Sequence, residues 1–167
     1  MAIFAKYDGI DGESKDANHD RWIDIVSVDW GAHQPGGGNA GRRRSSAVLE
    51  DMVLTMDYDK ASPKLQEKCL KGAIVPKLEI EFTASFGGAR ATYLRYELKN
   101  VMITSYEINS SDEDAPPSVS IANQCEEIKA TYTEFDADGS SRGNIETEYK
   151  VRRKSKKKKG STRVRVG

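Results

Sequence analysis

Runs in which apolar or β-branched residues alternate with polar residues recur along most of the chain. In the clearest run, Leu78, Ile80 and Phe82 are separated by glutamates. This period of two is typical of strands with one buried face and one solvent-exposed face. Many short strands in succession indicate an antiparallel barrel or sandwich. We predict a mainly β domain of about eight strands, in the segments AIFAKYD, DRWIDIVSVDW, SSAVLEDMVLTMD, PKLEIEFTA, ATYLRYELKNVMITSYEIN, PSVSIANQC, EEIKATYTEF and NIETEYKVRR.

The second of these segments carries both tryptophans of the chain. Trp22, Val26, Val28 and Trp30 lie at even spacings. Residues at even spacings point to the same face of a strand. We therefore expect these four side chains to place most of the bulk of the segment on one face.

The segment ASPKLQEKCLKG departs from this alternation and carries helix signals at both ends. Ser62 suits the N-cap, Pro63 suits the first helical position, and Gly72 can adopt the left-handed conformation that ends a helix. We predict one short helix here. The residues expected to face the core are Leu65, Cys69 and Leu70.

A Gly-rich loop, WGAHQPGGGNAGRRRSS, lies between two strand-like segments and holds five glycines and three consecutive arginines. Loops of this length are uncommon in compact domains and are usually functional or disordered. A phosphate-binding loop would need a following helix and usually a GK[ST] ending, and the run that follows here reads as a strand. A flexible linker and a contact with another subunit remain as interpretations.

The residue types that usually carry catalysis or bind metals form no recognisable motif. His19 and His33 are the only histidines, lack metal-binding spacing, and are interpreted as surface or loop residues. Cys69 and Cys125 lie in no CxxC or Cys/His pattern and are interpreted as buried thiols. We expect no enzyme activity, cofactor or metal.

The stretch DADGSSRGNIE has the composition of a calcium-binding loop but not its spacing. In an EF-hand loop the glycine is the sixth residue and a glutamate is the twelfth, whereas here Gly139 is fourth and Thr147 is twelfth. Aspartate and glycine are also typical of tight turns. We therefore predict a polar hairpin turn between two strands.

Charge is distributed very unevenly, although the formal net charge of the chain is zero. Residues 150–167 contain ten Lys or Arg and no acid, while residues 1–149 contain 16 basic and 26 acidic side chains, a net charge of −10. The basic end is compatible with a disordered tail, an arm that binds nucleic acid, or a contact with an acidic neighbour. Its last residues, TRVRV, alternate like a short edge strand.

Membrane and export signals are not apparent in the sequence. Residues 1–160 contain no apolar run that approaches a membrane span, and the opening MAIFAKYDGIDGES lacks the basic and hydrophobic regions of a signal peptide. We expect no membrane insertion and no general secretory signal.

Several ordered segments resemble the haemolysin-coregulated protein (Hcp) family of the bacterial type VI secretion system. They are IFAKYDGIDGES, DWG, GGGNAGRRR, DMVLTMDYDKASPKL with CLKG behind it, YLRYELKNVMITSYEIN and EIKATYTEFDADG. The resemblance runs in order from residue 3 to residue 150. Each piece alone is short, but the ordered set is specific.

The resemblance implies a small antiparallel β-barrel of two packed sheets with one short helix and an extended loop. It also implies a structural, non-enzymatic role as a subunit of the inner tube, in which six-membered rings stack. The implied partners are copies of the chain itself, the type VI sheath and spike, and effector proteins carried in the ring lumen. Synthesis in the bacterial cytoplasm and secretion without a signal peptide follow from the same resemblance.

The Gly-rich loop then becomes the candidate contact between subunits or rings. Glycines allow another backbone to approach closely, and arginines can pair with an acidic neighbour. The candidate interface residues are Gly36, Gly37, Gly38, Gly41, Arg42, Arg43 and Arg44.

The basic C-terminus is longer than the resemblance leads us to expect, so we divide the chain into a barrel domain, 1–153, and a basic tail, 154–167. The alternative function is a β-barrel module that binds nucleic acid through this tail. Steep salt dependence of binding would distinguish that alternative.

Overall fold

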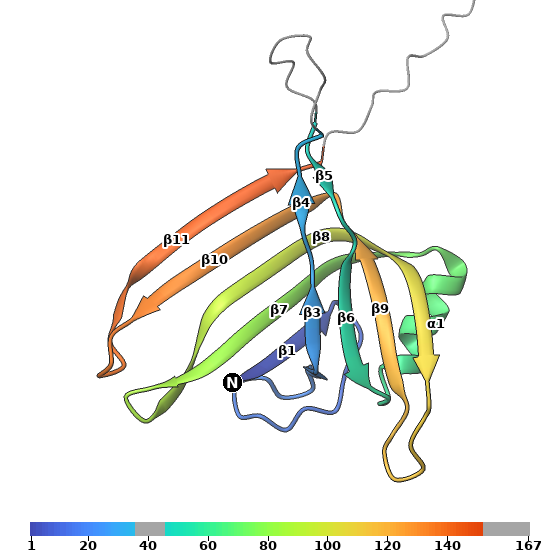
Figure 1. Cartoon of the computed structure of the whole chain (residues 1–167), viewed down its shortest axis with the longest axis horizontal. Helices are drawn as coiled ribbons and strands as arrows, with labels where there is room; N and C mark the ends of the chain where they lie inside the picture. The colour runs from blue at the N-terminus through green and yellow to red at the C-terminus, as the bar shows by residue number, and fades with distance from the viewer. Residues whose placement is uncertain (36–45, 152–167) are drawn as a thin grey trace, which may run out of the picture.

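The computed structural model describes residues 1–35 and 46–151 and contains, in this part of the chain, eleven strands and one helix (Figure 1). The elements are β1 (Ala2–Tyr7), β2 (Ile23–Ile25), β3 (Ser27–Asp29), β4 (Ala32–His33), β5 (Val48–Leu49), β6 (Met52–Asp57), α1 (Ser62–Lys71), β7 (Ile74–Phe86), β8 (Ala89–Asn109), β9 (Ser118–Gln124), β10 (Glu127–Phe135) and β11 (Ser141–Lys150). The mainly β class with one helix is confirmed.

Nine strands form one curled antiparallel sheet with the order β2-β1-β7-β8-β9-β6-β3, and β10 and β11 branch from β8. The remaining two strands, β4 and β5, form a separate ribbon. The predicted barrel is not closed by hydrogen bonding, because no ladder among the described residues joins the edges β2 and β3. These two edges are instead connected through one residue, Val26, whose N–H donates to the Thr55 carbonyl at 2.7 Å.

The change of partner at Val26 also corrects the prediction for the tryptophan-containing segment. β2 pairs with β1 and β3 pairs with β6, so the face presented to the core changes between them. Ile23 and Ile25 are buried, whereas Val26 is exposed and Trp22 and Trp30 are half-buried. The bulk of the segment therefore does not lie on one face.

One edge of the long strand β8 pairs with β7, and its other edge pairs with two strands in turn. Residues 94–99 pair with β10, and residues 102–109 pair with β9. Asn100 lies between these stretches with φ of 51°, a left-handed conformation that asparagine tolerates better than most residues. Its side-chain amide donates to the Glu126 carboxylate at 3.0 Å, and this hydrogen bond links the point where β8 changes partner to the residue before β10.

The helix α1 lies where the sequence predicts it, but it begins differently. Ser62 is the first helical residue and not the cap; its buried hydroxyl accepts a hydrogen bond from the Asp59 N–H at 3.1 Å. Gly72 ends the helix with φ of 58°, as expected. Leu65 is buried and Cys69 packs against the core, but Leu70 is 78% exposed, so its predicted core position is wrong.

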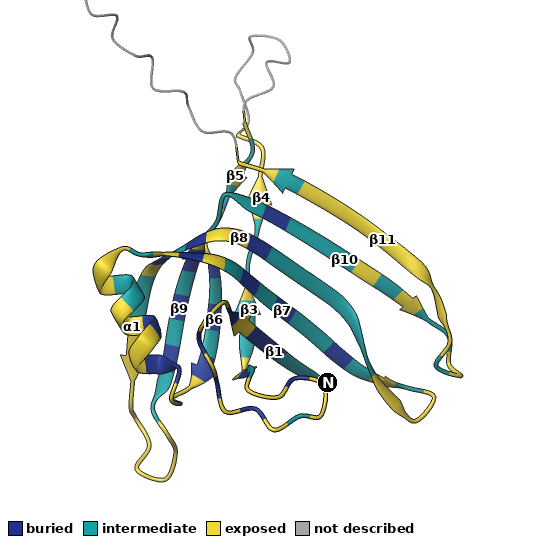
Figure 2. Ribbon diagram, turned by 180° about the vertical axis from the view of Figure 1, so that it is seen from behind, coloured by how far each residue is buried: buried dark blue, intermediate teal, exposed yellow. Residues whose placement is uncertain are grey.

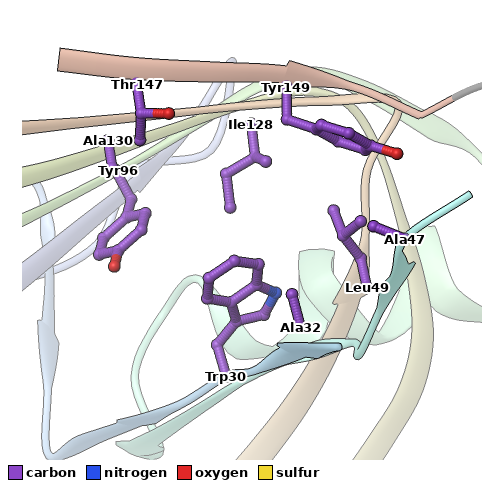
Figure 3. Close-up of a pocket in the computed structure, with 9 residues that line it drawn as sticks. All are labelled: Trp30, Ala32, Ala47, Leu49, Tyr96, Ile128, Ala130, Thr147 and Tyr149. Atoms are coloured by element: carbon purple, nitrogen blue, oxygen red, sulfur yellow. The ribbon is translucent and has the colours of Figure 1, made fainter. Parts of the chain in front are cut away.

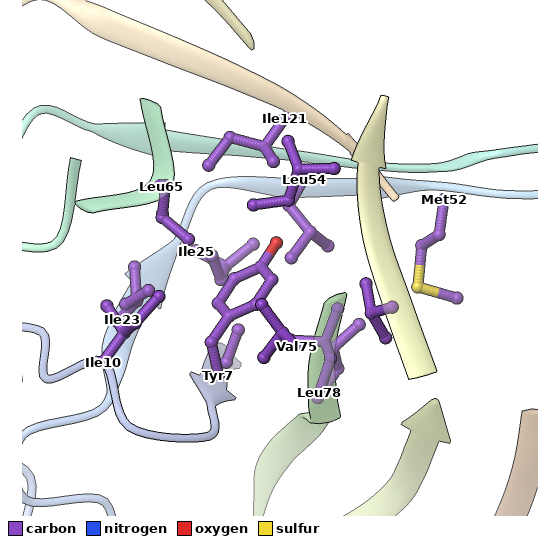
Figure 4. Close-up of a cluster of buried hydrophobic side chains, with 14 of the residues drawn as sticks. Tyr7, Ile10, Ile23, Ile25, Met52, Leu54, Leu65, Val75, Leu78 and Ile121 are labelled. Atoms are coloured by element: carbon purple, nitrogen blue, oxygen red, sulfur yellow. The ribbon is translucent and has the colours of Figure 1, made fainter. Parts of the chain in front are cut away.

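The core lies inside the curl of the sheet, where β1, β2, β6, β7 and β9 meet α1 (Figure 4). The inward residues of β7 alternate with its glutamates as predicted, with Leu78 and Ile80 fully buried. A polar pair crosses this core: the Tyr7 hydroxyl donates to Asn123 at 2.7 Å, and the Asn123 amide donates to the Met52 carbonyl at 3.0 Å.

The β10–β11 hairpin, which we call the wing, extends from the core along one side of the sheet (Figures 1 and 2). Its turn spans residues 136–140, which confirms the hairpin predicted for DADGSSRGNIE. The wing tip contacts the β7–β8 turn, since a Cβ added to Gly87 would lie 2.3 Å from the Asp138 carbonyl oxygen. Phe86 and Phe135 stack beside this contact with centroids 4.8 Å apart.

Candidate assembly surfaces

The ribbon of β4 and β5 is the stem of the Gly-rich loop. Ala32 pairs with Leu49 and His33 pairs with Val48, so two register pairs bring the loop ends together. The predicted interface residues lie outside the described residues. They are Gly36, Gly37, Gly38, Gly41, Arg42, Arg43 and Arg44. The stem projects from the sheet at the end of the molecule where β11 also finishes (Figure 1).

An apolar groove separates this stem from the sheet (Figure 3). It has a volume of about 290 Å³ and opens to solvent. Trp30 rises from one wall, while Ile128 and Tyr149 lie across from it on β10 and β11. The remaining lining residues are Ala32, Ala47, Leu49, Tyr96, Ala130 and Thr147. Apolar surface left open to solvent is a candidate contact surface for another chain.

The opposite face of the sheet is polar and carries a ladder of ion pairs across β7 and β8. Lys77 lies 2.5 Å from Glu79, and Arg95 lies 3.0 Å from the same carboxylate. Burial alone would raise the pKa of Glu79, but the hydrogen bond from Lys77 and the charge of Arg95 outweigh it and hold the pKa below its usual value. The hydrogen bond to Glu79 raises the pKa of Lys77. This face is the wet side of the sheet that the alternation predicts.

The ion pairs continue onto the wing, where the carboxyl groups outnumber the cations that pair with them. Lys129 lies 3.5 Å from Glu146, and Lys99 lies 3.9 Å from Glu127. The Glu148 carboxyl lies within hydrogen-bonding reach of Glu127, and this contact lowers the pKa of Glu127. Two carboxyl groups side by side attract a further cation.

β11 is the outer edge of the wing and is the most exposed long strand of the sheet (Figure 2). Nine of its ten residues are exposed and Tyr149 alone is half-buried. Within residues 1–35 and 46–151, only β10 pairs with it. An exposed edge strand offers unpaired N–H and C=O groups to another strand.

His19 is not the surface residue that the sequence predicts. Its ring is 3% exposed, stacks on Phe4 with centroids 4.2 Å apart and meets the edge of Trp22. Its Nδ1 lies 2.7 Å from Asp16, and its Nε2 lies 3.2 Å from Glu81. The hydrogen bond to His19 is the main cause that lowers the pKa of Asp16. The cluster holds the loop before β2 against β7.

The remaining chemistry-bearing residues are dispersed. His33 is exposed, as predicted. Both cysteines are free and are half-buried rather than buried; burial raises the pKa of the Cys125 thiol to about 11. Among the described residues, no group of three or more His, Cys, Asp or Glu side chains could hold a metal ion. None of the helices in this described part has the length and apolarity needed to cross a bilayer.

Sequence reasoning identified the loop but missed the groove and the buried histidine. The residues that line the groove come from three distant parts of the sequence, so no local sequence motif predicts it. For His19, the only signal is a histidine between an aspartate three residues earlier and a tryptophan three residues later. That spacing becomes informative only when the loop is seen to pack on Phe4.

The sequence matches the family described as "Type VI secretion system effector, Hcp" over residues 4–138. Protein hcp1 of Pseudomonas aeruginosa is 27% identical over 143 residues, which cover 84% of this chain and 88% of that protein.

Solved structures give the same result. A structure of a type six secretion system protein superposes with a TM-score of 0.82 at 25% identity, covering 90% of this chain and 95% of that one. A type VI secretion system effector from Yersinia pestis superposes with a TM-score of 0.74 at 27% identity, covering 89% and 99%. The chain therefore belongs to the Hcp family of type VI secretion tube proteins.

Proposed function

We propose that this chain is a structural subunit of a type VI secretion tube and assembles into stacked hexameric rings. Membership of the Hcp family, matched over residues 4–138, is the observation that carries the proposal. The role is architectural, without catalysis. The partners proposed with it are further copies of the chain, the sheath and spike of the machine, and effector proteins held in the ring lumen.

The exposed surfaces of a single copy support this assembly. The ribbon stem projects away from the curled sheet, and only its Leu49 packs against the buried core cluster. The apolar groove at its base remains open in one copy. A second copy seated against the stem would cover both features. Repeated binding of one face of a subunit to a different face of its neighbour generates a ring when the rotation between copies closes.

The oligomeric state in solution tests the proposal directly. Purified full-length chain, at micromolar concentration and low salt and without nucleic acid, is examined by light scattering coupled to size-exclusion chromatography and by negative-stain electron microscopy. We expect a single species with the mass of six chains and a ring outline. A monodisperse monomer would overturn the proposal, and a monomer or dimer with steeply salt-dependent nucleic-acid binding would favour the alternative function.

Within the rings, we propose that the Gly-rich loop makes the contact between subunits or rings. Gly36, Gly37, Gly38 and Gly41 would allow close backbone approach, and Arg42, Arg43 and Arg44 would pair with an acidic neighbour. The body of the chain, residues 1–149, carries the net charge of −10 that this pairing needs.

The triple substitution Arg42→Glu, Arg43→Glu, Arg44→Glu tests this role. Reversed charges would face an acidic partner, so assembly should weaken while the fold is retained. Circular dichroism provides the control for folding, and the triple substitution to lysine provides the control for charge. Unchanged ring or tube formation with normal circular dichroism would show that the loop is only a spacer.

We propose further that residues 1–153 act as the ring-forming domain and that the basic tail, 154–167, assists stacking through contact with an adjacent ring. Individual exposed ion pairs contribute only about 0 to 1 kcal/mol, so the tail would act collectively and its effect would fade with salt. A chain truncated after Arg153 should form rings but stack them more weakly and with less salt sensitivity. Equal stacking at every ionic strength would contradict this role.

A further inference from the structure

The outer edge of β11 is an unused pairing surface with two distinct faces. Ile145, Thr147 and Tyr149 point to the face that bears the apolar groove, since Thr147 and Tyr149 line it. Glu146 and Glu148 alternate with them and point to the charged face. Ile145 is 75% exposed, so the apolar face of this strand is open at Ile145, whereas Tyr149 is half-buried.

The last residues of the chain have the complementary pattern. Thr162, Val164 and Val166 alternate with Arg163 and Arg165. As a strand, this segment would present valines on one face and arginines on the other. It follows β11 after the ten residues 152–161, which include Gly160 and are long enough to reverse the chain direction. Val151 still donates its N–H to the Glu126 carbonyl, so the chain leaves the sheet directly beside this edge.

We propose that residues 162–166 of the same chain add to the outer edge of β11 as an antiparallel strand. One register satisfies both faces at once: Val164 lies opposite Thr147, and Val166 lies opposite Ile145. The same register places Arg163 opposite Glu148 and Arg165 opposite Glu146. A shift by one residue would place both valines among the glutamates, so the register is specified by the side chains.

Electrostatics favour the same arrangement. Glu148 lies against the carboxyl of Glu127, and Glu146 has Lys129 as its neighbour at 3.5 Å. An arginine opposite Glu148 would place a cation between two carboxyl groups, where its planar donor set can serve both. Opposite charges directly across a strand pair stabilise pairing, and the strand would close the long edge that β11 leaves open.

Pairing within one chain is favoured because the segment is tethered next to the edge of β11. A short tether gives an effective concentration in the millimolar range, and a second copy would compete only if its own concentration in solution were that high. The run of lysines between residues 154 and 159 would then return as a loop at the end of the molecule that bears the ribbon stem. This inference does not depend on ring assembly, and the measurements below apply equally to one copy or to six.

Engineered disulfides test the register. In the full-length chain with Cys69→Ala and Cys125→Ala, the pair Thr147→Cys and Val164→Cys should form an intrachain disulfide. The matched control is Thr147→Cys with Arg163→Cys, which places the second thiol on the opposite face. Under the same glutathione buffer, we expect the first pair to close at least about tenfold faster, since disulfides need Cα atoms within about 7 Å and converging Cβ vectors.

The products are identified by non-reducing electrophoresis and by mass spectrometry of the linked peptides. Equal closing rates for the two pairs would show that the tail has no register on β11 and would overturn the proposal. A disulfide that forms only between chains, at a rate that rises with protein concentration, would replace this pairing by one with a second copy and would also overturn it.

Hydrogen exchange keeps the proposal testable if the cysteine variants fold poorly. The full-length chain is compared with a chain truncated after Gly160. Truncation should accelerate exchange by about tenfold or more at those amides of residues 145–149 that point away from β10, and it should leave the core strand β7 unchanged. Identical exchange along β11 in the two chains would overturn the proposal.

Discussion

The core end of the sheet, which contains β6 and β9, and the wing both consist of strands in which apolar and polar residues alternate. The side chains of the two regions nevertheless differ greatly in how far they are buried. In β6 and β9, the inward positions are almost fully buried, whereas β11 is exposed along nearly its whole length. The core end is covered by α1 and by the curl of the sheet, and the wing has only the open groove beside it. Stability therefore resides in the core end, and the wing and stem are available for contacts with other surfaces.

Removing a core side chain should have the largest effect on folding. Leu54 is fully buried, so Leu54→Ala should lower the free energy of unfolding by about 2–5 kcal/mol. The same substitution at Leu70, which is 78% exposed, should cost less than about 0.5 kcal/mol. Urea denaturation at one fixed protein concentration measures both, because assembly would add to the apparent stability. Similar losses at the two leucines would contradict the division between core and surface.

The polar pair inside the core should come next. Asn123→Ala leaves the Tyr7 hydroxyl and the Met52 carbonyl without their partner, and we expect a loss of about 1–3 kcal/mol in the free energy of unfolding. Tyr7→Phe removes only the hydroxyl and should cost less. In the double variant the two losses should be less than additive, because the residues share one hydrogen bond. Full additivity in a double-mutant cycle would show that the bond contributes nothing.

The His19 cluster should make a smaller, pH-dependent contribution. The pKa of Asp16 is lowered on folding, chiefly by its hydrogen bond to His19, so its stabilising effect is present above the usual pKa of 3.8 and is lost as the pH falls through the folded-state pKa. The difference in unfolding free energy between the native chain and Asp16→Asn should therefore shrink as the pH is lowered from 5 to below 4. Denaturant titrations at several pH values measure it.

A second variant provides the control for this pH dependence. In a His19→Gln background, the imidazole that lowers the pKa of Asp16 is gone. Adding Asp16→Asn there should change the pH profile much less. An unchanged acid response in both backgrounds would place the titrating group elsewhere.

The smallest effect is expected on the wing. Lys129→Met removes an exposed ion pair with Glu146 on the charged face. Such pairs contribute about 0 to 1 kcal/mol, and we expect a change within about 0.5 kcal/mol in thermal or urea denaturation. A loss as large as that of the core variants would show that the wing is an integral part of the folding unit and would remove the contrast between the two regions.

Much of the local structure could be predicted because it depends on neighbouring residues. The alternation of β7, the left-handed Gly72 after α1 and the turn at residues 136–140 each follow from a few adjacent positions. The common face predicted for Val26 and the core position predicted for Leu70 were both wrong, because burial depends on what lies opposite a residue. The predicted loop interface stays a prediction, since its residues lie outside the described part of the chain.

The sequence by itself determined that the chain is mainly β with one helix, that its charge is divided between an acidic body and a basic end, and that its ordered motifs match the Hcp family. Only the tertiary structure decided which strand each segment pairs with. Val26 and Asn100 mark the points where one segment changes partner, and His19 becomes buried because distant Phe4 and Glu81 meet it. The physical reason is that alternation selects a face for each side chain, whereas non-local hydrogen bonding and packing select the partner that covers that face.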